Sequence, residues 1–477
     1  MIIDPINFHY HNNMYSPQLV LLLLLIVVAS NILCSASLAL PMVHSRSLAM
    51  TISKKSSRVL PLQSLDYMME PLRGFRDGYL ITLNLGSPPQ LLQAYVDTGS
   101  DLTWVPCGAV SFDCVDCDDY KDYKLPSTFS PLRSSTSLRD LCASPLCAGI
   151  HSSDNPYDAC AVAGCSLSSL VGGTCPRPCP SFAYNYGAGG VVVGSLTRDT
   201  LRVHTARDPA PTAEVPSFCF GCVGSSYREP IGIAGFGKGA LSLPSQLGLL
   251  RRGFSHCFLP FKFANNPNIS SPLVVGEVAN SDNSHFTPML KNPVFPNYYY
   301  IGLEGIGVGN GSLVEVPSSL NSFDPEGNGG LLIDSGTTYT HLPGPLYDRL
   351  LRELGSTIAY PRAEDVERRT GFDLCYEVPS SNGSALLPTV AFRFSGNVEL
   401  VLPTDDCFYA MGPPKGSTVA KCLLFRRMEE GGYGPAGVFG SFQQQNVEVV
   451  YDMERERIGF QPMDCASSAD NHGLHLK

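Results

Sequence analysis

Short runs in which apolar and polar residues alternate occur along most of the chain. Such a period of two is typical of half-buried β-strands, and residues 79–85, 390–394 and 447–451 show it clearly. Gly and Pro, 45 and 38 of the 477 residues, separate these runs and predict frequent turns. The helical period is clearest in two short segments, Leu241–Leu250 and Leu346–Leu354. The pattern therefore predicts a mainly β protein with a few short helices.

The N-terminal part differs from the rest of the chain. Residues 19–29 are an unbroken apolar run of 11 residues, shorter than the roughly 20 that span a bilayer. Small residues follow, so we interpret residues 1–39 as a signal peptide with cleavage after Ala36 or Ala39, and an uncleaved anchor is the alternative. No Lys or Arg precedes the run, which is atypical of a signal peptide, and Met14 is an alternative start.

Residues 40–76 carry six Lys or Arg against two Asp or Glu, although the whole chain has a formal net charge of −10. We interpret this basic segment as a prosegment that docks on an acidic surface, and a disordered leader is the alternative. With 44% hydrophobic residues the chain is too apolar for general disorder. Its acidic balance argues against nucleic acid as a partner, because phosphates require a basic face. Residues 467–477 are polar, so we expect no lipid-anchoring tail and no stable membrane anchor.

The chain has 17 cysteines, of which Cys34 lies in the predicted signal peptide. In a secreted chain the other 16 are expected to form disulfides. Nine fall in residues 107–179, which have little periodicity and which we interpret as a disulfide-stabilised surface insertion. The pairs Cys114–Cys117 and Cys219–Cys222 have the spacing of zinc ligands, but about 100 residues separate them, so no metal site is expected. Three N-glycosylation sequons also fit the secretory pathway, at Asn268, Asn310 and Asn382.

An Asp-Ser/Thr-Gly motif occurs twice, as Asp97-Thr-Gly-Ser and as Asp334-Ser-Gly-Thr. Each copy follows an apolar run, and an apolar-apolar-Gly sequence follows each copy, in residues 231–235 and 437–440. One copy alone is as easily a turn, in which Asp caps the chain and Gly takes a positive φ. Two copies in the same order predict two homologous lobes, each with an aspartate on a loop.

Two carboxylates that face each other do not ionise together readily, so Asp97 and Asp334 are expected to share one proton over a wide pH range. The ionised member can take a proton from a bridging water, and the protonated member can polarise a carbonyl and later protonate a leaving amine. The residues after each aspartate support the pair in this hypothesis. Thr98 and Ser335 would cross-brace the loops, Ser100 and Thr337 would bind the outer carboxylate oxygens, and Gly99 and Gly336 would admit backbone N–H groups.

Asp97–Cys107 and Asp334–Pro343 resemble the two active-site motifs of pepsin-like (A1) aspartic proteases. The Cys-rich insertion is similar to that of the plant, nepenthesin-like branch, and the resemblance covers residues 77–465. It implies an all-β, bilobal fold with pseudo-two-fold lobes, here residues 77–280 and 290–466, and a cleft between them. It also implies hydrolysis of polypeptides at acid pH by a water held between two aspartates, without a metal or a cofactor.

The same resemblance assigns further residues. Tyr186 is similar to the tyrosine of the flap that closes over substrate, and Trp104, the only tryptophan, to its hydrogen-bond partner. Ala188 departs from the branch, which usually has Asp there, so the resemblance leaves specificity and rate open. Tyr184 is the alternative flap tyrosine. The implied disulfides join Cys222 to Cys465 and Cys375 to Cys422.

Two functions are compatible with this sequence. The first is a secreted aspartic endopeptidase of the extracellular fluid or cell wall, with the vacuole as the alternative destination. The second is a non-catalytic, xylanase-inhibitor-like binding protein on the same scaffold. Such relatives typically have degraded motifs, whereas both motifs are intact here, so we favour the enzyme, and we expect a monomer. No His-Glu-x-x-His or Gly-x-Ser-x-Gly motif offers a rival mechanism, and the Gly-rich residues 305–311 lack the spacing of a nucleotide-binding loop.

Overall fold

The computed structural model describes most of the chain. The described residues are 37–47, 77–108, 112–117, 128–152, 158–187, 189–204, 212–266, 268–278, 285–309, 311–380, 387–428 and 432–467. Outside them lie the apolar run 19–29, most of the predicted prosegment and of the polar tail, Ala188, Asn310 and Asn382. Within the described ranges, no helix combines the length and the apolar character that crossing a membrane requires.

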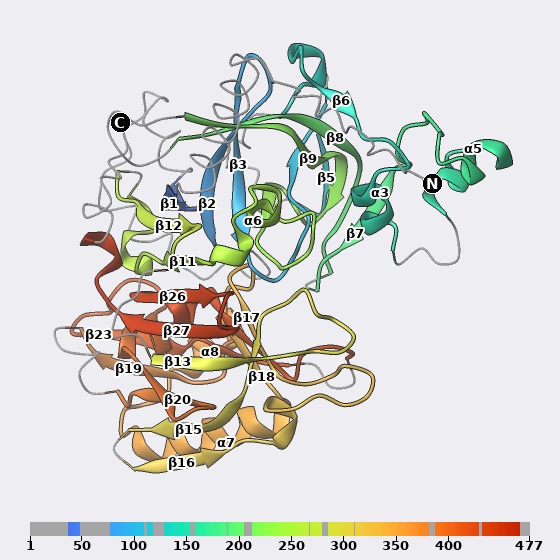
Figure 1. The fold of residues 1–477 in the computed structure, drawn as a ribbon. Helices are drawn as coiled ribbons and strands as arrows, with labels where there is room; N and C mark the ends of the chain where they lie inside the picture. Colours follow the sequence, from blue (N-terminus) through green and yellow to red (C-terminus); the bar gives the residue numbers. More distant parts are fainter. Residues whose placement is uncertain are drawn as a thin grey trace, which may run out of the picture. The chain divides into compact units, whose positions relative to one another are not determined.

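Strands dominate the structure, as the alternating pattern predicts (Figure 1). In the first half, β2 (Tyr79–Leu85) and β3 (Gln90–Asp97) form one antiparallel hairpin. The long strands β8 (Val191–His204) and β9 (Thr212–Tyr227) form another, and β2 pairs with β8. Short strands complete this half: β4 (Trp104–Pro106), β5 (Asp113–Val115), β6 (Leu138–Arg139), β7 (Phe182–Asn185) and β10 (Gly232–Gly235).

The second half contains three groups of strands. The first group pairs in the order β14 (Tyr300–Ile301), β17 (Leu331–Asp334), β25 (Gly437–Gly440), β18 (Thr340–Leu342) and β24 (Phe425–Arg427). The second is a sheet of β16 (Ser312–Glu315), β15 (Leu303–Val308), β20 (Val390–Phe394) and β21 (Val398–Leu402). The third is a sheet of β19 (Cys375–Pro379), β23 (Thr418–Leu423) and β22 (Phe408–Ala410).

One further sheet joins the two halves. Its order is β1 (Leu38–His44), β12 (Ser271–Val275), β11 (Phe254–Cys257), β26 (Val447–Asp452), β27 (Arg457–Pro462) and β13 (His285–Leu290). β11 belongs to the first half and β26 to the second, and they pair from Phe254 opposite Tyr451 to Cys257 opposite Glu448. β1 also pairs with the start of β2. We call this the linking sheet; the apolar core continues through it from one half to the other.

The internal repeat predicted from the sequence is visible in the strand pairing. Asp97 at the end of β3 lies opposite Gly235 of β10, and Asp334 at the end of β17 lies opposite Gly440 of β25, both in parallel pairs. The residues seven positions after each aspartate repeat the relation in antiparallel pairs, Trp104 opposite Ile233 and His341 opposite Val438. The prediction of an all-β fold with two related lobes is confirmed.

The helices agree with the sequence in part. α7 (Gly344–Thr357) contains the predicted segment Leu346–Leu354 and buries its apolar face. The prediction for Leu241–Leu250 is only partly right, because α6 there spans Leu243–Gln246 alone. Gly248 follows with a φ of +70°, the left-handed conformation in which helices commonly end. The other α-helices of the described residues are α3 (Pro145–Ile150), α4 (Ala159–Val162), α5 (Leu167–Val171), α8 (Glu364–Thr370) and α9 (Thr404–Cys407).

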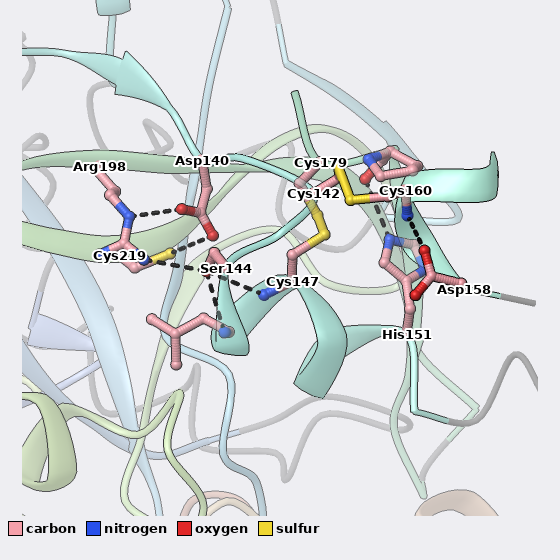
Figure 2. Close-up of a disulfide and its surroundings, with 12 residues drawn as sticks. Asp140, Cys142, Ser144, Cys147, His151, Asp158, Cys160, Cys179, Arg198 and Cys219 are labelled. Atoms are coloured by element: carbon pink, nitrogen blue, oxygen red, sulfur yellow. Dashed lines mark hydrogen bonds and ion pairs between the residues drawn. A yellow bond between two sulfur atoms is a disulfide. The ribbon is translucent and has the colours of Figure 1, made fainter. Parts of the chain in front are cut away.

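Disulfides hold the Cys-rich insertion together. Three of them fasten the short helices α3, α4 and α5 to the neighbouring chain: Cys142–Cys160 ends in α4, Cys147–Cys179 starts in α3, and Cys165–Cys175 joins the residues on either side of α5. Figure 2 shows the first turn of α3 beside them, where Ser144 caps the helix and Asp140 accepts a hydrogen bond from Arg198. Cys114 and Cys117 form a fourth bond in the same insertion.

The predicted disulfide between Cys222 and Cys465 is wrong. Cys222 is bonded to Cys107, and Cys465 to Cys257. β4 lies parallel to β9 with Val105 opposite Cys222, which brings the next turn of chain, with Cys107, beside β9. β11 ends at Cys257 in the linking sheet, next to the last strands of the chain.

Of the four remaining cysteines in the described residues, two form a disulfide and two are free thiols. The structure contains the Cys375–Cys422 disulfide, which bridges β19 and β23. Cys219 and Cys407 are buried and not disulfide-bonded, so the expectation that all 16 cysteines pair is wrong. Burial, with a smaller contribution from Asp140, raises the pKa of the Cys219 thiol to about 12. This thiol is therefore unreactive at physiological pH.

Candidate active site

Four hydrogen bonds tie the two aspartate loops to each other. The backbone N–H of Thr98 donates to Ser335 Oγ and that of Ser335 donates to Thr98 Oγ1, each at 3.0 Å. The hydroxyls donate onward, Thr98 to the Ile333 carbonyl at 3.1 Å and Ser335 to the Val96 carbonyl at 2.8 Å. Thr98 and Ser335 are buried, so water does not compete for these bonds. The symmetric bracing fixes the position of one aspartate relative to the other.

Each aspartate carboxylate accepts one N–H and one hydroxyl from its own loop. The bonds are Gly99 N–H to Asp97 Oδ1 at 3.0 Å, Ser100 Oγ to Asp97 Oδ2 at 2.8 Å, Gly336 N–H to Asp334 Oδ1 at 2.8 Å and Thr337 Oγ1 to Asp334 Oδ2 at 2.6 Å. The two halves of the chain therefore orient their carboxylates with the same groups in the same places.

The glycines of the two loops show how closely each carboxylate approaches the opposite loop. A Cβ on Gly99 would lie 2.6 Å from Asp334 Oδ1, and a Cβ on Gly336 would lie 2.5 Å from Asp97 Cγ. Only Gly leaves room for these approaches. Asp97 is 2% exposed and Asp334 is half-buried. The arrangement places each carboxylate directly against the loop that holds the other.

A tyrosine–tryptophan pair adjoins the first aspartate loop. The Trp104 indole N–H donates to the Tyr186 hydroxyl at 2.7 Å, and both side chains are buried. Tyr186 follows β7 in a tight turn, since its N–H donates to the Gly190 carbonyl at 2.8 Å and the Gly189 N–H donates to the Tyr186 carbonyl at 2.9 Å. Tyr186 rather than Tyr184 is thus the partner of Trp104. The turn leads into β8, as expected of a flap hairpin.

Asp101 lies beside the aspartate loops and is missed by the sequence analysis. Its carboxylate accepts the Gly239 N–H and the Asn297 side-chain amide, both at 2.7 Å. Burial raises the pKa of Asp101, the bonds from Gly239 and Asn297 act in the opposite direction, and nearby Asp97 adds to the rise. One signal was available, because the same position in the second motif is Thr338, so an acid here breaks the repeat.

Tyr298 is a second neighbour that no motif identifies. Burial raises the pKa of its phenol, and Asp101, Asp97 and Asp334 each raise it further. The phenol therefore lies within electrostatic reach of all three carboxylates. Tyr298 belongs to a run of three tyrosines that precedes and enters β14, and nothing in that run distinguishes it from its neighbours.

The described residues offer two clusters of metal-ligand atoms, and both lie in the insertion. The sulfurs of Cys142, Cys160, Cys165 and Cys175 lie within 4.8 Å of one another, as do the ligand atoms of Cys147, His151 and Cys179. All of these cysteines are disulfide-bonded, so they present no thiolate to a metal. Figure 2 shows four of them, Cys142, Cys147, Cys160 and Cys179. A pocket of about 530 Å³ beside them is lined by residues of α3, α4 and α5 and by the chain around them, and its lining includes neither Asp97 nor Asp334.

The sequence is similar to curated plant aspartic proteases. A probable aspartyl protease of Arabidopsis thaliana is 34% identical, over 82% of this chain and 83% of its own length. Nepenthesin-1, an aspartic proteinase of Nepenthes gracilis, is 31% identical, over 85% of this chain and 84% of its own. The families described as "Xylanase inhibitor N-terminal" and "Xylanase inhibitor C-terminal" match residues 79–277 and 298–462.

The fold also has solved counterparts. The crystal structure of basic 7S globulin from soybean superposes with a TM-score of 0.60 at 19% identity and covers 91% of this chain and 99% of its own. At that identity the likeness shows the fold alone. The curated relatives, the matched families and the paired aspartate loops agree, and the chain belongs to the pepsin-like (A1) aspartic protease family, with the plant nepenthesins among its relatives.

Proposed function

We propose that this protein is a secreted aspartic endopeptidase with an acid pH optimum. The observation that carries the proposal is the symmetric site, in which each carboxylate is held by an N–H and a hydroxyl and approaches the glycine of the opposite loop. A binding protein has no need of two such carboxylates. An acid optimum follows from the pair, because it acts with one proton shared between its members.

In the proposed mechanism Asp97 and Asp334 hold a water between them. The ionised carboxylate accepts a proton from the water as its oxygen attacks the scissile carbonyl carbon. The protonated carboxyl donates its hydrogen bond to the carbonyl oxygen, and the resulting tetrahedral intermediate collapses as the leaving amine receives a proton. Tyr186, held by Trp104, covers the substrate from the flap side. No metal or cofactor takes part in this scheme.

Replacement of either aspartate tests the mechanism. Asp97→Asn or Asp334→Asn should abolish cleavage, because losing a positioned acid or base costs at least about 10²–10⁴-fold in rate. The assay is digestion of a peptide library at acid pH, with and without a statine-type inhibitor. Asn keeps the size and one acceptor of Asp, so an unchanged melting temperature is the control for folding. Near-normal turnover by either variant would rule out the shared-water mechanism.

The substrate proposed is an extended peptide with bulky apolar side chains at the cut. Pepsin-like relatives favour such residues, so we expect Phe, Leu or Tyr beside the scissile bond, with Ala188 making the preference looser. The same library digest reports the preference. A profile dominated by charged residues on both sides of the cut would contradict it.

A xylanase-inhibitor-like binding function is the second candidate. The descriptions of the two matched families favour it. The two functions separate in one experiment, in which the wild type and Asp97→Asn are assayed for peptide cleavage and for inhibition of xylanases. Inhibition by both forms without cleavage by either would establish the binding function in place of the enzyme.

We further propose that residues 40–76 are a prosegment of a secreted, glycosylated precursor. Leu38–His44 forms the edge strand β1 of the linking sheet, so cleavage after Ala36 leaves the strand whole and cleavage after Ala39 removes its first two residues. Arg46 binds Asp77 through two hydrogen bonds of 2.8 and 2.7 Å. Asn268 is exposed and accessible to glycosylation.

N-terminal sequencing before and after acidification tests the prosegment. We expect a latent form at neutral pH and a new N-terminus between Leu72 and Tyr79 after acid treatment, since a cut ahead of β2 leaves its pairs with β3 and β8 intact. Full activity at pH 7 with Pro41–Arg76 still attached would contradict the latency.

A further inference from the structure

Asp101 binds two segments that are distant in the sequence. Its Oδ1 accepts the N–H of Gly239, 138 positions along the chain, and its Oδ2 accepts the side-chain amide of Asn297, 196 positions along, both at 2.7 Å. Asp is well suited to this place. A carboxylate accepts at both oxygens, whereas an amide of the same size accepts at one atom and donates at the other.

The loop after β10 is shaped around this carboxylate. A Cβ on Gly239 would lie 2.5 Å from Asp101 Cγ, and a Cβ on Gly237 would collide with Asp101 Oδ1. The N–H of Phe236 donates to the Asp97 carbonyl, and that of Gly237 to the Ser100 carbonyl, both at 2.8 Å. The loop 236–239 therefore lies directly against the first aspartate loop, and it can do so because its glycines leave space for Asp101.

The same loop contacts the chain that leads into the second half. The Lys238 N–H donates to the Asn297 carbonyl at 2.7 Å, and the Tyr299 hydroxyl donates to the Phe236 carbonyl at 2.8 Å. The side chain of Asn297 donates in turn to Asp101. Asp101, Asn297 and the loop 236–239 thus form one hydrogen-bonded junction, named here the Asp101 junction, between the first aspartate loop and the entry to β14.

The strand that leads into the flap turn, β7, also comes close to Asp101, and we call it the flap strand. Burial raises the pKa of the Tyr184 phenol on this strand, and the backbone of Asp101, which lies within reach of the phenol, acts in the opposite direction. The ring of Tyr184 lies 5.2 Å from the ring of Tyr186, which accepts the bond from Trp104. The backbone of Asp101 therefore lies close to the flap strand, and its carboxylate belongs to the Asp101 junction.

We propose that Asp101 is a positioning residue that holds the Asp97 loop, the flap strand and the entry to the second half in the arrangement that cleavage requires. The proposal rests on the proposed proteolytic function. It predicts that a loss of the two carboxylate bonds misplaces Asp97 and the flap without removing either. Misplacement of a reacting group by about 1 Å can cost about 10²-fold in rate.

Three variants test this role in the full-length protein. Asp101→Leu keeps a comparable size but accepts no hydrogen bond, and Asn297→Asp places two carboxylates in contact. Each should lower kcat about 10- to 100-fold with a smaller change in KM, because the geometry of the reacting groups changes more than the binding of the peptide.

The double variant Asp101→Asn with Asn297→Asp exchanges donor and acceptor, and it should recover kcat to within about threefold of the wild type. Glu315→Gln, an exposed change on β16, is the control and should leave kcat unchanged.

Amide hydrogen exchange supplies a readout that does not depend on catalysis. In Asp101→Leu we expect faster exchange at the N–H groups of Gly239 and Tyr186, and in the double variant a return toward the wild-type rates. A wild-type kcat in Asp101→Leu, or no recovery in the double variant, would overturn the positioning role while cleavage that depends on Asp97 still stands. If the wild type shows no cleavage that depends on Asp97, the proposed proteolytic function fails. In that case hydrogen exchange still tests the structural role of Asp101, because unchanged exchange in Asp101→Leu would show that Asp101 does not hold the loop 236–239 and the flap in place.

Discussion

At the scale of single residues, the site depends on the space that its glycines leave as much as on the groups that its other side chains supply. Asp97 and Asp334 accept equivalent bonds, an N–H and a hydroxyl from their own loops. Each also requires a glycine, without a side chain, in the opposite loop. A methyl group on either glycine would clash with the opposite carboxylate, which two hydrogen bonds hold in place. The smallest substitution in the site therefore tests its geometry.

Gly336→Ala should strongly lower activity while both aspartates remain. Its Cβ would lie 2.5 Å from Asp97 Cγ, so Asp97 must leave its bonds with Gly99 and Ser100. We expect a loss in kcat of about 10²-fold or more, because displacing a reacting group by about 1 Å can cost that much in rate. Gly149→Ala is the control, because nothing lies within 4 Å of its Cβ and the residue is in α3. That change should keep kcat and add about 0.5–1 kcal/mol of stability. Wild-type kcat in Gly336→Ala would contradict the described approach of the loops.

At the scale of secondary-structure elements, the linking sheet carries the connection between the halves. β11 and β26 pair across it, and the disulfide Cys257–Cys465 ties the end of β11 to the chain after β27. That bond closes a loop with a sequence separation of 208 residues. A cross-link over so long a loop restricts the unfolded chain strongly, by about 5 kcal/mol in the chain-entropy estimate.

The double variant Cys257→Ala with Cys465→Ala should therefore lower the melting temperature by several degrees. The matched control is Cys114→Ala with Cys117→Ala, which opens a loop with a sequence separation of 3 residues, worth only about 2 kcal/mol in the same estimate. Differential scanning calorimetry of both variants measures the difference. Equal losses, or a larger loss in the control, would contradict the expected dependence of the stabilisation on loop length.

At the scale of the whole molecule, the attachment of the N-terminal strand should weaken in acid. Burial lowers the pKa of His44 to about 4, with Asp77 acting upward and Arg46 downward. Burial alone would raise the pKa of Asp77, but the charge and hydrogen bonds of Arg46, with His44, bring it below the usual value. His44 also packs edge-on against Tyr79 and Phe261, so its neutral ring belongs to the core around β1.

The sign of the effect is the same for both groups. Unfolded His44 takes up a proton near pH 6.5 and folded His44 only near pH 4, so the stability present at neutral pH is lost progressively between these values, by up to about 3 kcal/mol. Asp77 has its folded pKa below its unfolded one, so its contribution is present above pH 3.8 and lost as pH falls through the lowered value.

Hydrogen exchange of the β1 amides at pH 7 and pH 4.5 measures the expected weakening. His44→Phe keeps an aromatic ring between Tyr79 and Phe261 without a titrating group, so it should reduce the change between the two pH values. His285→Phe, at an exposed position on β13, is the control and should leave that change as in the wild type. An identical pH dependence in His44→Phe and the wild type would exclude His44 as its source.

Much of this protein is determined by its sequence alone. The alternating pattern places β2 and β20 at the predicted residues. β20 buries every second side chain fully, as the pattern predicts, whereas β2 is buried at every position except Thr82. The repeated Asp motif predicts the two lobes, and its neighbours Thr98 and Ser335 form the predicted bracing, because these contacts are encoded within a few residues of each aspartate. The resemblance also assigns the bond between Trp104 and Tyr186 correctly.

Other features depended on tertiary structure. The partners of Cys222 and Cys465 follow from which strands lie side by side, and composition and spacing do not encode that neighbourhood. Leu38–His44 is an edge strand only because β12 and β2 offer it open pairing positions. The sequence shows that Asp101 breaks the repeat but does not show its role, because the groups that give it a role, on Gly239 and Asn297, reach it only when the two halves fold together.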